Sequence, residues 1–311
     1  MRPILVAAAL AAASAVLAPA ATGQDPPPAE APQDPAREAL RKELADEVAS
    51  PVGFRLVETD PLFVLTQVHD RRFLDELSSR IALLQAVIER DFPLGVDEGE
   101  APPPPVVVRL YGSQETYVAA GGPEASSNFV DADGKRFLIF DQRAGGRRDF
   151  WRTFAGLQFK AHWVRAVGMP WPHGWMLHGH EDYYGGYELH SGRLVRKPNP
   201  WRQGTARQLA RQGTTIPFNE FLRWRGREYY GGDIQWGVGE TYAQGWSFVW
   251  FLRTLPGSRN KPEGWQASWE LILDRYLAGM RTTHDKSVAV DAALSGVDLP
   301  ALEAAWRESL D

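Results

Sequence analysis

Four of the seven histidines in the chain lie within a short segment that also contains two carboxylates. Imidazole and carboxylate groups are the ligands that zinc most often takes in proteins, together with thiolates. The chain contains no cysteine, so histidine, aspartate and glutamate are the candidate metal ligands. The residues of interest are His162, His173, His178, His180, Glu181 and Asp182.

Three of these side chains have a spacing that suits a metal site. His178 and Glu181 are three residues apart, so they share one face of a helix. Together with His162 from another helix, they would form a set of two histidines and one carboxylate, which can bind zinc or iron and leave coordination positions open. Glu181 could instead act as a base if it stays outside the ligand set. The alternative is that these are surface histidines beside a polar cleft that holds no metal. His173 and His180 could face the same cleft, or else they are hydrogen-bonded structural residues.

Two helices are expected to position this set. Residues 150–167 contain no proline and place apolar residues at helical spacing, and Pro170 and Pro172 follow them. Residues 175–184 form the second helical candidate. The sequence therefore predicts either no cofactor or a single zinc ion held between two consecutive helices.

The segment order resembles that of the gluzincins, which are peptidase-MA-like metallopeptidases. The stretch "MPWPHGWMLHGHEDYYGG" resembles their proline-tryptophan approach and third-ligand helix. Further along, "TYAQGWSFVWFL" and "ALSGVDLPALEAAW" resemble the helical remainder of the small secreted members. The resemblance covers about residues 54–310. It implies an exported protein in which one helix carries an H-E-x-x-H motif and the next carries the third zinc ligand.

The motif positions depart from the gluzincin pattern. Aligned on its second histidine, the motif falls on "QFKAH", so Gln158 takes the place of the first histidine and Phe159 that of the catalytic glutamate, while His162 remains. His178 replaces the ligand glutamate, and Asp182 stands where the resemblance implies a carboxylate that supports the first histidine position, here Gln158. Phe159 cannot accept a proton, and the loss of a general base lowers a rate by roughly a hundred- to ten-thousand-fold. The resemblance thus implies a degenerate site.

Aromatic residues offer two further candidates. Tyr242 lies where a gluzincin-like fold could place a phenol that stabilises an oxyanion, or else it belongs to the apolar stripe of its own helix. Carbohydrates stack on indole rings, so the twelve tryptophans suggest a glycan-binding surface as an alternative. The best candidates for it are Trp201, Trp224 and Trp236, in the Arg- and Trp-rich segment 191–239, whose structure and role the sequence does not predict.

The elements before the histidine segment predict an α+β fold. Two strands in "FRLVETD" and "LFVLTQV", an amphipathic helix in "DRRFLDELSSRIALLQAVIERDF", a strand in "VVVRLY" and a hairpin that turns at Asp133 and Gly134 indicate a small mixed sheet with a packed helix. A mainly helical, gluzincin-like half follows. Its later helices are predicted in "TYAQGWSFVWFLRTLPG", "GWQASWELILDRYLAGM" and "LPALEAAWRESL".

The amino terminus indicates export. Residues 1–20 combine a basic start, the apolar run "ILVAAALAAASAVLA" and a small-x-small cleavage pattern, which is typical of a signal peptide. Residues 21–50 are expected to form a proline-rich linker and a weakly packed lead-in helix. Residues 51–311 would form the peptidase-MA-like domain, with a sheet part at about 51–149 and a helical part at about 150–311. We expect a secreted or periplasmic protein without a stable membrane span once the signal is cleaved.

Composition and motif together favour a binding function. The net charge of −5 argues against nucleic acid, whose partners usually carry a basic face. We expect a non-catalytic pseudo-peptidase that binds a peptide, a wall component or a protein partner in the ancestral cleft. One alternative is an active metal-dependent hydrolase that uses His162, His178 and Glu181. The other is a glycan-binding envelope protein. The sequence does not identify the ligand or the oligomeric state.

Overall fold

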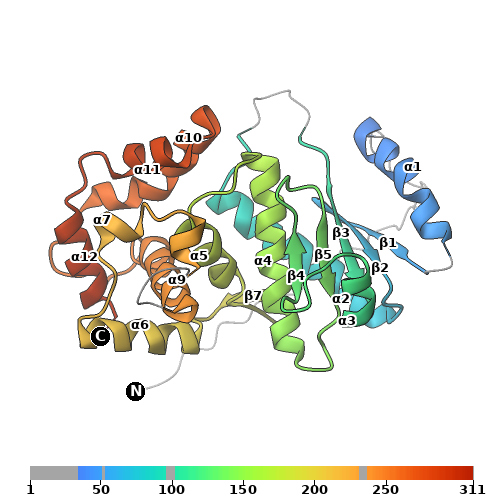
Figure 1. Ribbon diagram of the computed structural model, residues 1–311, viewed down its shortest axis with the longest axis horizontal. Helices are drawn as coiled ribbons and strands as arrows, with labels where there is room; N and C mark the ends of the chain where they lie inside the picture. Colours follow the sequence, from blue (N-terminus) through green and yellow to red (C-terminus); the bar gives the residue numbers. More distant parts are fainter. Residues whose placement is uncertain (1–33, 51–52, 96–101, 231–236, 311) are drawn as a thin grey trace, which may run out of the picture.

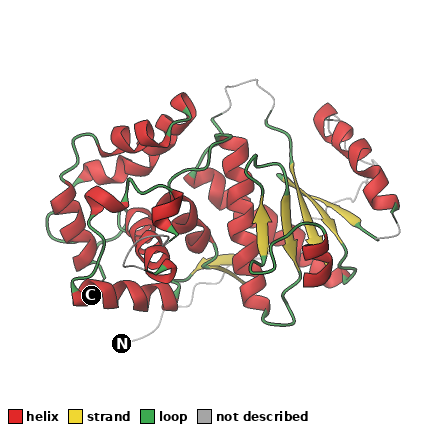
Figure 2. Ribbon diagram, in the orientation of Figure 1, coloured by secondary structure: helices red, strands yellow, loops and turns green. Residues whose placement is uncertain are grey.

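The computed structural model describes residues 34–50, 53–95, 102–230 and 237–310. The predicted signal peptide at 1–20 and most of the predicted linker lie outside these ranges. Within them, no helix is both long and apolar enough to cross a membrane. The fold is α+β, as predicted, with the sheet in the first half of the chain and helices dominating the second half (Figures 1 and 2).

A five-stranded mixed sheet with the order β1-β2-β3-β5-β4 forms the first half. β2, β3 and β5 are parallel, and the two outer strands each pair antiparallel with their neighbour. The strands and the hairpin that the sequence predicts are confirmed, and Gly134 in the hairpin turn has the positive φ of 68° that suits glycine. The strands are β1 (Arg55–Glu58), β2 (Leu62–Thr66), β3 (Val106–Tyr111), β4 (Asn128–Val130) and β5 (Phe137–Phe140).

Helices cover both faces of this sheet. Successive strand residues point to opposite faces, so each strand contributes to two apolar layers. On one face, Val64 and Ile139 pack against α2 (Arg71–Asp91) and α4 (Arg147–Ala166). On the other face, the alternate residues, Phe63 among them, pack against α1 (Pro35–Ala49) and α3 (Gln114–Ala119).

α1 is the helix that the sequence predicts as a weakly packed lead-in, and Leu44 is its one fully buried residue. Leu44 is buried in the layer beneath the sheet. Glu47 accepts two hydrogen bonds from the Arg109 guanidinium, at 2.5 and 2.9 Å, and Arg41 pairs with Glu58 on β1. Leu40 and Leu44 and these ion pairs attach the helix, although its overall composition is that of a solvated segment.

The second half contains the predicted helices and several elements that the sequence did not predict. The predicted ones are α5 (Gly174–Tyr184), α9 (Val238–Thr254), α10 (Ile272–Thr283) and α12 (Leu299–Glu308). "GWQASWELILDRYLAGM" is not one helix from its start, because the chain is still extended at Gln266 and a 3-10 turn, η1 (Ala267–Leu271), precedes α10. The elements that the sequence did not predict are β6 (Tyr187–His190), β7 (Arg193–Arg196), α6 (Pro200–Gln212), α7 (Phe218–Phe221), α8 (Gly226–Tyr229) and α11 (Lys286–Leu294).

Two of the unpredicted elements carry recognisable sequence signals. The β6–β7 hairpin turns at Ser191 and Gly192, which both have positive φ, and a two-residue turn of this kind suits a tight hairpin. α6 begins with the capping residue Asn199 and has Pro200 in its first turn. The segment 191–239 therefore contains ordinary turn and cap chemistry within its arginine-rich composition.

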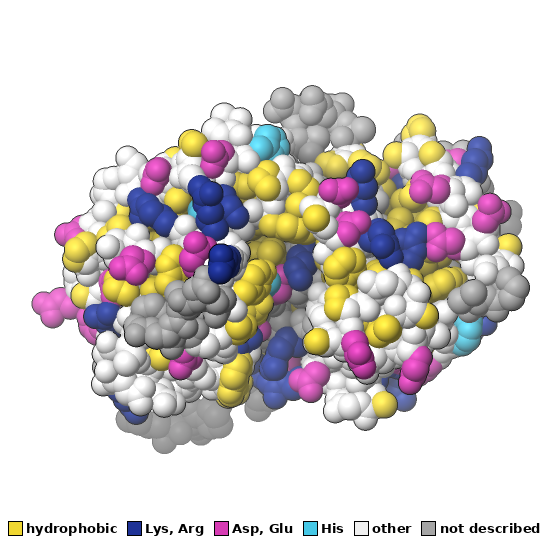
Figure 3. All heavy atoms as spheres, in the orientation of Figure 1, with side chains coloured by type: hydrophobic (Ala, Val, Ile, Leu, Met, Phe, Trp, Pro, Cys, Tyr) yellow, Lys and Arg dark blue, Asp and Glu magenta, His cyan; other side chains and the backbone are white. Residues whose placement is uncertain are grey.

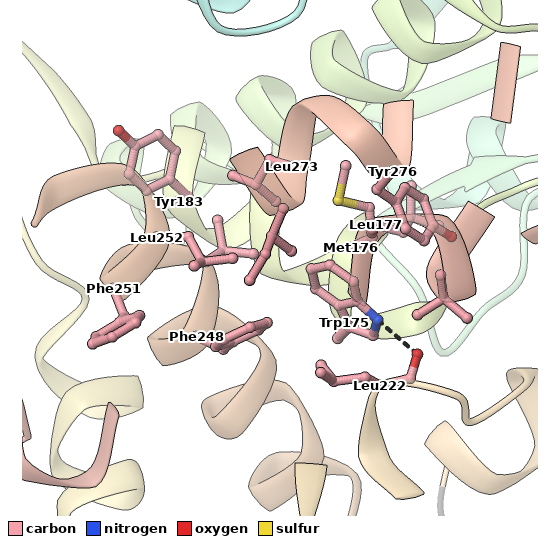
Figure 4. Packing of buried hydrophobic residues seen from close by; sticks show 14 of the residues in the cluster. Trp175, Met176, Leu177, Tyr183, Leu222, Phe248, Phe251, Leu252, Leu273 and Tyr276 are labelled. Atoms are coloured by element: carbon pink, nitrogen blue, oxygen red, sulfur yellow. Dashed lines mark hydrogen bonds between the residues drawn. The ribbon is translucent and has the colours of Figure 1, made fainter. Parts of the chain in front are cut away.

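Aromatic residues form the core of the helical half (Figure 4). Trp175 of α5 makes edge contacts with Phe248 of α9 and Tyr276 of α10, at ring-centroid distances of 5.4 and 5.5 Å. Its indole N–H donates to the Leu222 carbonyl at 3.0 Å, so the one polar atom of this buried ring is satisfied. These contacts join α5 to the rest of the helical half.

α5 and α9 pack with almost no side-chain atoms between them at one point. A Cβ atom on Gly179 would lie 2.7 Å from both the Gly245 carbonyl oxygen and the nearest Val249 methyl. Any other residue at 179 would therefore push the two helices apart. This contact sets the position of α5, the helix that carries His178 and Glu181.

Candidate functional site

α4 lies between the two cores and contributes to both. Phe154, Leu157 and Ala161 pack against the sheet, while Phe159 and Trp163 pack into the helical half. This double role explains why most of the helix is buried rather than amphipathic. Its remaining side-chain positions divide between a side that faces α2 and a side that faces α5.

Phe159 is a core residue. Its ring stacks on the His180 ring at a centroid distance of 5.2 Å and lies 5.3 Å from the ring of Tyr184. The side chain is fully buried. The position that the alignment assigns to the catalytic glutamate therefore lies inside the protein, where a carboxylate could not polarise a water molecule in a cleft.

Gln158 and His162 face α2. The Gln158 side-chain amide donates to the Ile81 carbonyl at 2.9 Å. The His162 Nε2 atom lies 2.6 Å from the Phe92 carbonyl oxygen, to which it donates, and Nδ1 accepts from the Gln85 amide at 3.0 Å. Burial lowers the pKa of His162 to about 4, so the ring is neutral at physiological pH. His162 is thus a buried structural residue with both nitrogens used.

The side of α4 that faces α5 carries Gly156 and Lys160, which are four residues apart. The Lys160 ammonium lies 2.9 Å from Glu181 Oε1. A Cβ atom on Gly156 would be 3.1 Å from the Cβ of Glu181, so the glycine allows the two helices to approach closely here. Lys160 was not among the predicted site residues, although its spacing from Gly156 places both on one helix face.

His178 completes a chain of polar contacts with Glu181. Its Nδ1 atom is 3.1 Å from Glu181 Oε2, and its Nε2 atom is 2.8 Å from the Tyr230 hydroxyl. Because the carboxylate can only accept, we assign the ring proton to Nδ1, and Nε2 then accepts from Tyr230. The side chain of Tyr230 is half exposed. The chain therefore runs from a partly solvated phenol through an imidazole and a carboxylate to the Lys160 ammonium.

The charges of this chain follow from its surroundings. Burial alone would raise the pKa of Glu181, but Lys160 and His178 lower it to about 2. Burial raises the pKa of the Tyr230 phenol. At neutral pH, Glu181 is a carboxylate and Tyr230 is a protonated donor, which agrees with the hydrogen-bond directions assigned above.

Tyr242 reaches the site with its ring face. The Tyr242 ring stacks on the His178 ring at a centroid distance of 4.6 Å. The Tyr229 ring also stacks on the His178 ring, at 5.6 Å. Burial raises the pKa of Tyr242. Tyr242 thus packs against the helical core, as its membership of the apolar stripe predicts, and its role as a phenol that stabilises an oxyanion stays a prediction.

Asp182 has a different partner from the one predicted. Its Oδ2 atom accepts a hydrogen bond from Arg202 Nε at 2.6 Å, and the two side chains are largely buried together. Burial raises the pKa of Asp182, although Arg202 opposes the shift. Gln158, the position that Asp182 was expected to support, faces α2 instead. The physical reason is that Gln158 and His162 share one helix face, and that face is covered by α2.

The described residues do not fit a zinc ion in the predicted way. The structure brings His178 and Glu181 together but turns His162 toward α2. Across the described ranges, no group of three or more histidine, aspartate or glutamate side chains is placed to hold a metal. Lys160 supplies a positive charge at Glu181, where a cation would otherwise bind. Paired imidazoles that point at α5 would have to come from positions 156 and 160, which hold glycine and lysine.

The interpretation of His162 and His178 as surface histidines is wrong, whereas His173 and His180 are hydrogen-bonded structural residues. His162 and His180 are fully buried, and His178 is 7% exposed. The His180 Nδ1 atom lies 2.7 Å from the Met176 carbonyl, and His173 Nδ1 lies 2.9 Å from the Tyr276 hydroxyl. The rings pack because α4 and α5 both pass through the interior. The tryptophan candidates differ among themselves: Trp201 is 59% exposed, Trp224 is half-buried, and Trp236 lies outside the described residues.

A hollow runs over α4, between the sheet half and the helical half (Figure 3). Basic, acidic and histidine side chains appear along its floor, and apolar side chains form much of its walls. β4 is the outermost strand on this side, and the Asn128 side-chain oxygen lies 3.5 Å from the Lys160 ammonium. The polar chain and the edge of the sheet are therefore neighbours.

Comparison with known proteins adds no support to the resemblance to gluzincins, which therefore depends on the sequence of this chain alone. A scan against protein-family models gave no match, and a search of curated proteins gave none. The resemblance to gluzincins therefore stays a prediction, which rests on the order of the segments and on the third-ligand-like sequence of α5. The contacts add one qualification, since the face of α4 that meets α5 is not the face that carries Gln158 and His162.

Proposed function

We propose that the protein is an exported pseudo-peptidase that binds an extended peptide in its cleft and does not cleave it. The observation that carries the proposal is an open sheet edge beside a charge-compensated site without a general base. Export is supported by the signal-like sequence at 1–20. The peptide is the ligand class that an open strand edge recognises best, because the edge offers a row of main-chain donors and acceptors.

The register of β4 indicates which groups are available. The Asp131 N–H donates to the Arg136 carbonyl at 3.2 Å, just beyond the strand ends. Hydrogen-bonded pairs alternate along an antiparallel ladder, so Phe129 bonds to Leu138, whereas Asn128 and Val130 direct their main-chain groups away from β5. The Asn128 carbonyl accepts from the Ser126 hydroxyl. The Val130 N–H and carbonyl remain oriented to receive an added strand.

The polar chain supports recognition rather than catalysis. Glu181 Oε1 is ion-paired with Lys160 and Oε2 is hydrogen-bonded to His178, and these two partners lower the pKa of Glu181 to about 2, so the carboxylate is a poor acceptor for a proton from water. Tyr230 offers a half-exposed phenol that can contact a ligand in the cleft. We therefore expect no hydrolysis of casein or of generic peptides, with or without added zinc. Cleavage that a chelator abolishes would contradict the proposal.

The binding mode can be tested with one substitution. Val130→Pro removes an N–H that faces the open side and leaves the ladder to β5 intact, as proline allows on an edge strand. We expect affinity for a library of unstructured decapeptides, measured by fluorescence anisotropy, to fall at least about tenfold, which corresponds to one lost main-chain hydrogen bond of about 1.4 kcal/mol.

A matched control lies on the opposite edge of the sheet. The Thr59 N–H donates to the Leu62 carbonyl, so Glu58 also directs its main-chain groups away from its neighbour strand. Glu58→Pro should leave peptide affinity unchanged, although it removes the ion pair with Arg41. If both variants bind peptides as well as the parent protein does, strand addition at β4 is wrong.

A further inference from the structure

A second depression lies between the β6–β7 hairpin and the amino-terminal half of α4. Its outer groove has a volume of about 370 Å³ and is lined in part by Arg147, Arg148 and Glu188. A smaller hollow of about 20 Å³ adjoins it. Trp151 and Tyr187 line both, so we treat the two adjoining hollows as one depression with an outer and an inner part. None of these lining residues belongs to β4, which makes the depression independent of the proposed peptide edge.

The outer groove has a surplus of positive charge. Arg80 lines it together with Arg147 and Arg148, and Glu188 is the only carboxylate among its lining residues. Arg80 and Arg147 share Glu76 as a partner, and Arg148 pairs with Glu188 at 2.8 Å. A guanidinium has five N–H donors, so each arginine retains donors beyond these contacts. Such groups bind carboxylates in a bidentate manner.

The inner part of the depression is mainly apolar, and Trp151, one of its lining residues, has an unused donor. Ile81, Leu84 and Phe154 line it. The Trp151 indole N–H is buried and has no acceptor within the part of the chain that the structure describes, and the side chain is 9% exposed. Arg80 lies over the Trp151 ring at 4.3 Å. A buried donor without a partner is costly, so this N–H calls for an oxygen from a bound molecule or from a water.

We infer that this depression binds a small carboxylic acid that carries an apolar or aromatic group beside its carboxylate. The carboxylate contacts the arginines of the outer groove. The apolar group lies against the Trp151 and Tyr187 rings, and the indole N–H donates to a ligand oxygen. The site thereby discriminates against neutral molecules, because the guanidinium groups gain little from them, and against bare anions, because the aromatic surface then stays uncovered.

Phenylacetate is a suitable probe, and its neutral amide is the matched control ligand. We expect saturable binding of phenylacetate to the full chain by calorimetry or ligand-observed NMR, with a Kd of about 1 mM or below, as a ligand of about ten heavy atoms permits. Phenylacetamide and inorganic phosphate should each bind at least about tenfold more weakly. Equal binding of phenylacetamide overturns the role of charge. Equal binding of phosphate overturns the role of the apolar group.

Variants then locate the site. Arg147→Gln together with Arg148→Gln removes two half-exposed guanidinium groups and should weaken phenylacetate binding at least about tenfold. Arg211→Gln, at an exposed arginine of α6, should leave it unchanged. Trp151→Phe keeps a ring but removes the N–H, and should weaken binding about three- to tenfold. Thermal unfolding shows that each variant is folded. Unchanged binding in the double arginine variant overturns the inference, whatever Trp151→Phe does.

Discussion

The two sides of α4 carry polar residues in opposite circumstances. On the side that faces α2, Gln158 and His162 are fully buried and bonded to the main chain and to Gln85. On the side that faces α5, Lys160 is a charged residue paired with Glu181 beneath a half-exposed tyrosine. The alignment with a zinc motif places the site on the first side. The contacts place the candidate chemistry on the second, about half a helical turn away.

The difference between the two sides shows that the type of a residue alone does not predict whether it has a structural or a functional role. On the side that faces α2, called the inner side below, a histidine fills space and donates a hydrogen bond to a carbonyl. On the side that faces α5, called the outer side, a lysine supplies the positive charge that compensates the neighbouring carboxylate. The following predictions test this contrast, beginning with the largest expected effect.

Removing the two histidines should have unequal consequences for stability. His162→Ala leaves a cavity, an unpaired Phe92 carbonyl and an unpaired Gln85 donor, so we expect a loss of about 3–5 kcal/mol in the free energy of unfolding. His178→Ala should cost about 1–2 kcal/mol, because its partner Tyr230 can turn to solvent and Lys160 still compensates Glu181. Denaturant titration of both variants measures the difference. Equal losses would show that the two sides of α4 are energetically alike.

The inner side should also make stability depend on pH. The pKa of His162 is about 4 in the folded protein, whereas an exposed histidine has a value near 6.5, so the unfolded chain takes up the proton first as the pH falls. The stability that neutral His162 contributes is present above about pH 6.5 and is lost toward pH 4, by roughly 3 kcal/mol at about 1.4 kcal/mol per pH unit.

His162→Gln tests this dependence, because an amide can donate to Phe92 and accept from Gln85 without titrating. The difference in unfolding free energy between the parent and His162→Gln, followed from pH 7 to pH 4, should therefore change in favour of the variant. A difference that stays constant over this range would mean that His162 takes up its proton at the same pH in the folded protein as in the unfolded chain. Buried His173 and His180 titrate in both proteins, so their effects cancel.

The outer side should accept a metal ion more readily than the inner one. Lys160→His removes the resident charge and places an imidazole beside Glu181 and His178, so we expect zinc to bind at least about a hundredfold more tightly than to the parent, a gain of about 2.7 kcal/mol. Gln158→His, which pairs a second imidazole with His162, should give no gain because that side is covered by α2. Calorimetric titration of zinc compares them. A gain in Gln158→His alone would restore "QFKAH" as the metal helix.

Much of the fold could be predicted, because an element with one buried face repeats its apolar residues with the period of a helix or a strand. Strands such as 106–111 and the amphipathic α2 have clear patterns. The partner of each face of α4 could not be predicted, because that helix is buried on nearly all sides and its pattern does not distinguish sheet, α2 and α5. Asp182 illustrates the same limit, since its partner Arg202 lies twenty residues away on a helix that the sequence did not indicate.

The contact at Gly179 has a consequence for how this protein can change. α5 is located by main-chain atoms of α9 and by the absence of a side chain, and neither depends on which residues occupy positions 178, 181 or 160. Substitutions at these cleft positions therefore leave the packing of α5 against α9, here called the frame, intact. One added methyl group at position 179 would instead move α5 relative to α9 while every cleft residue is still present. For anyone who wishes to engineer the cleft, the frame and the chemistry are separate variables.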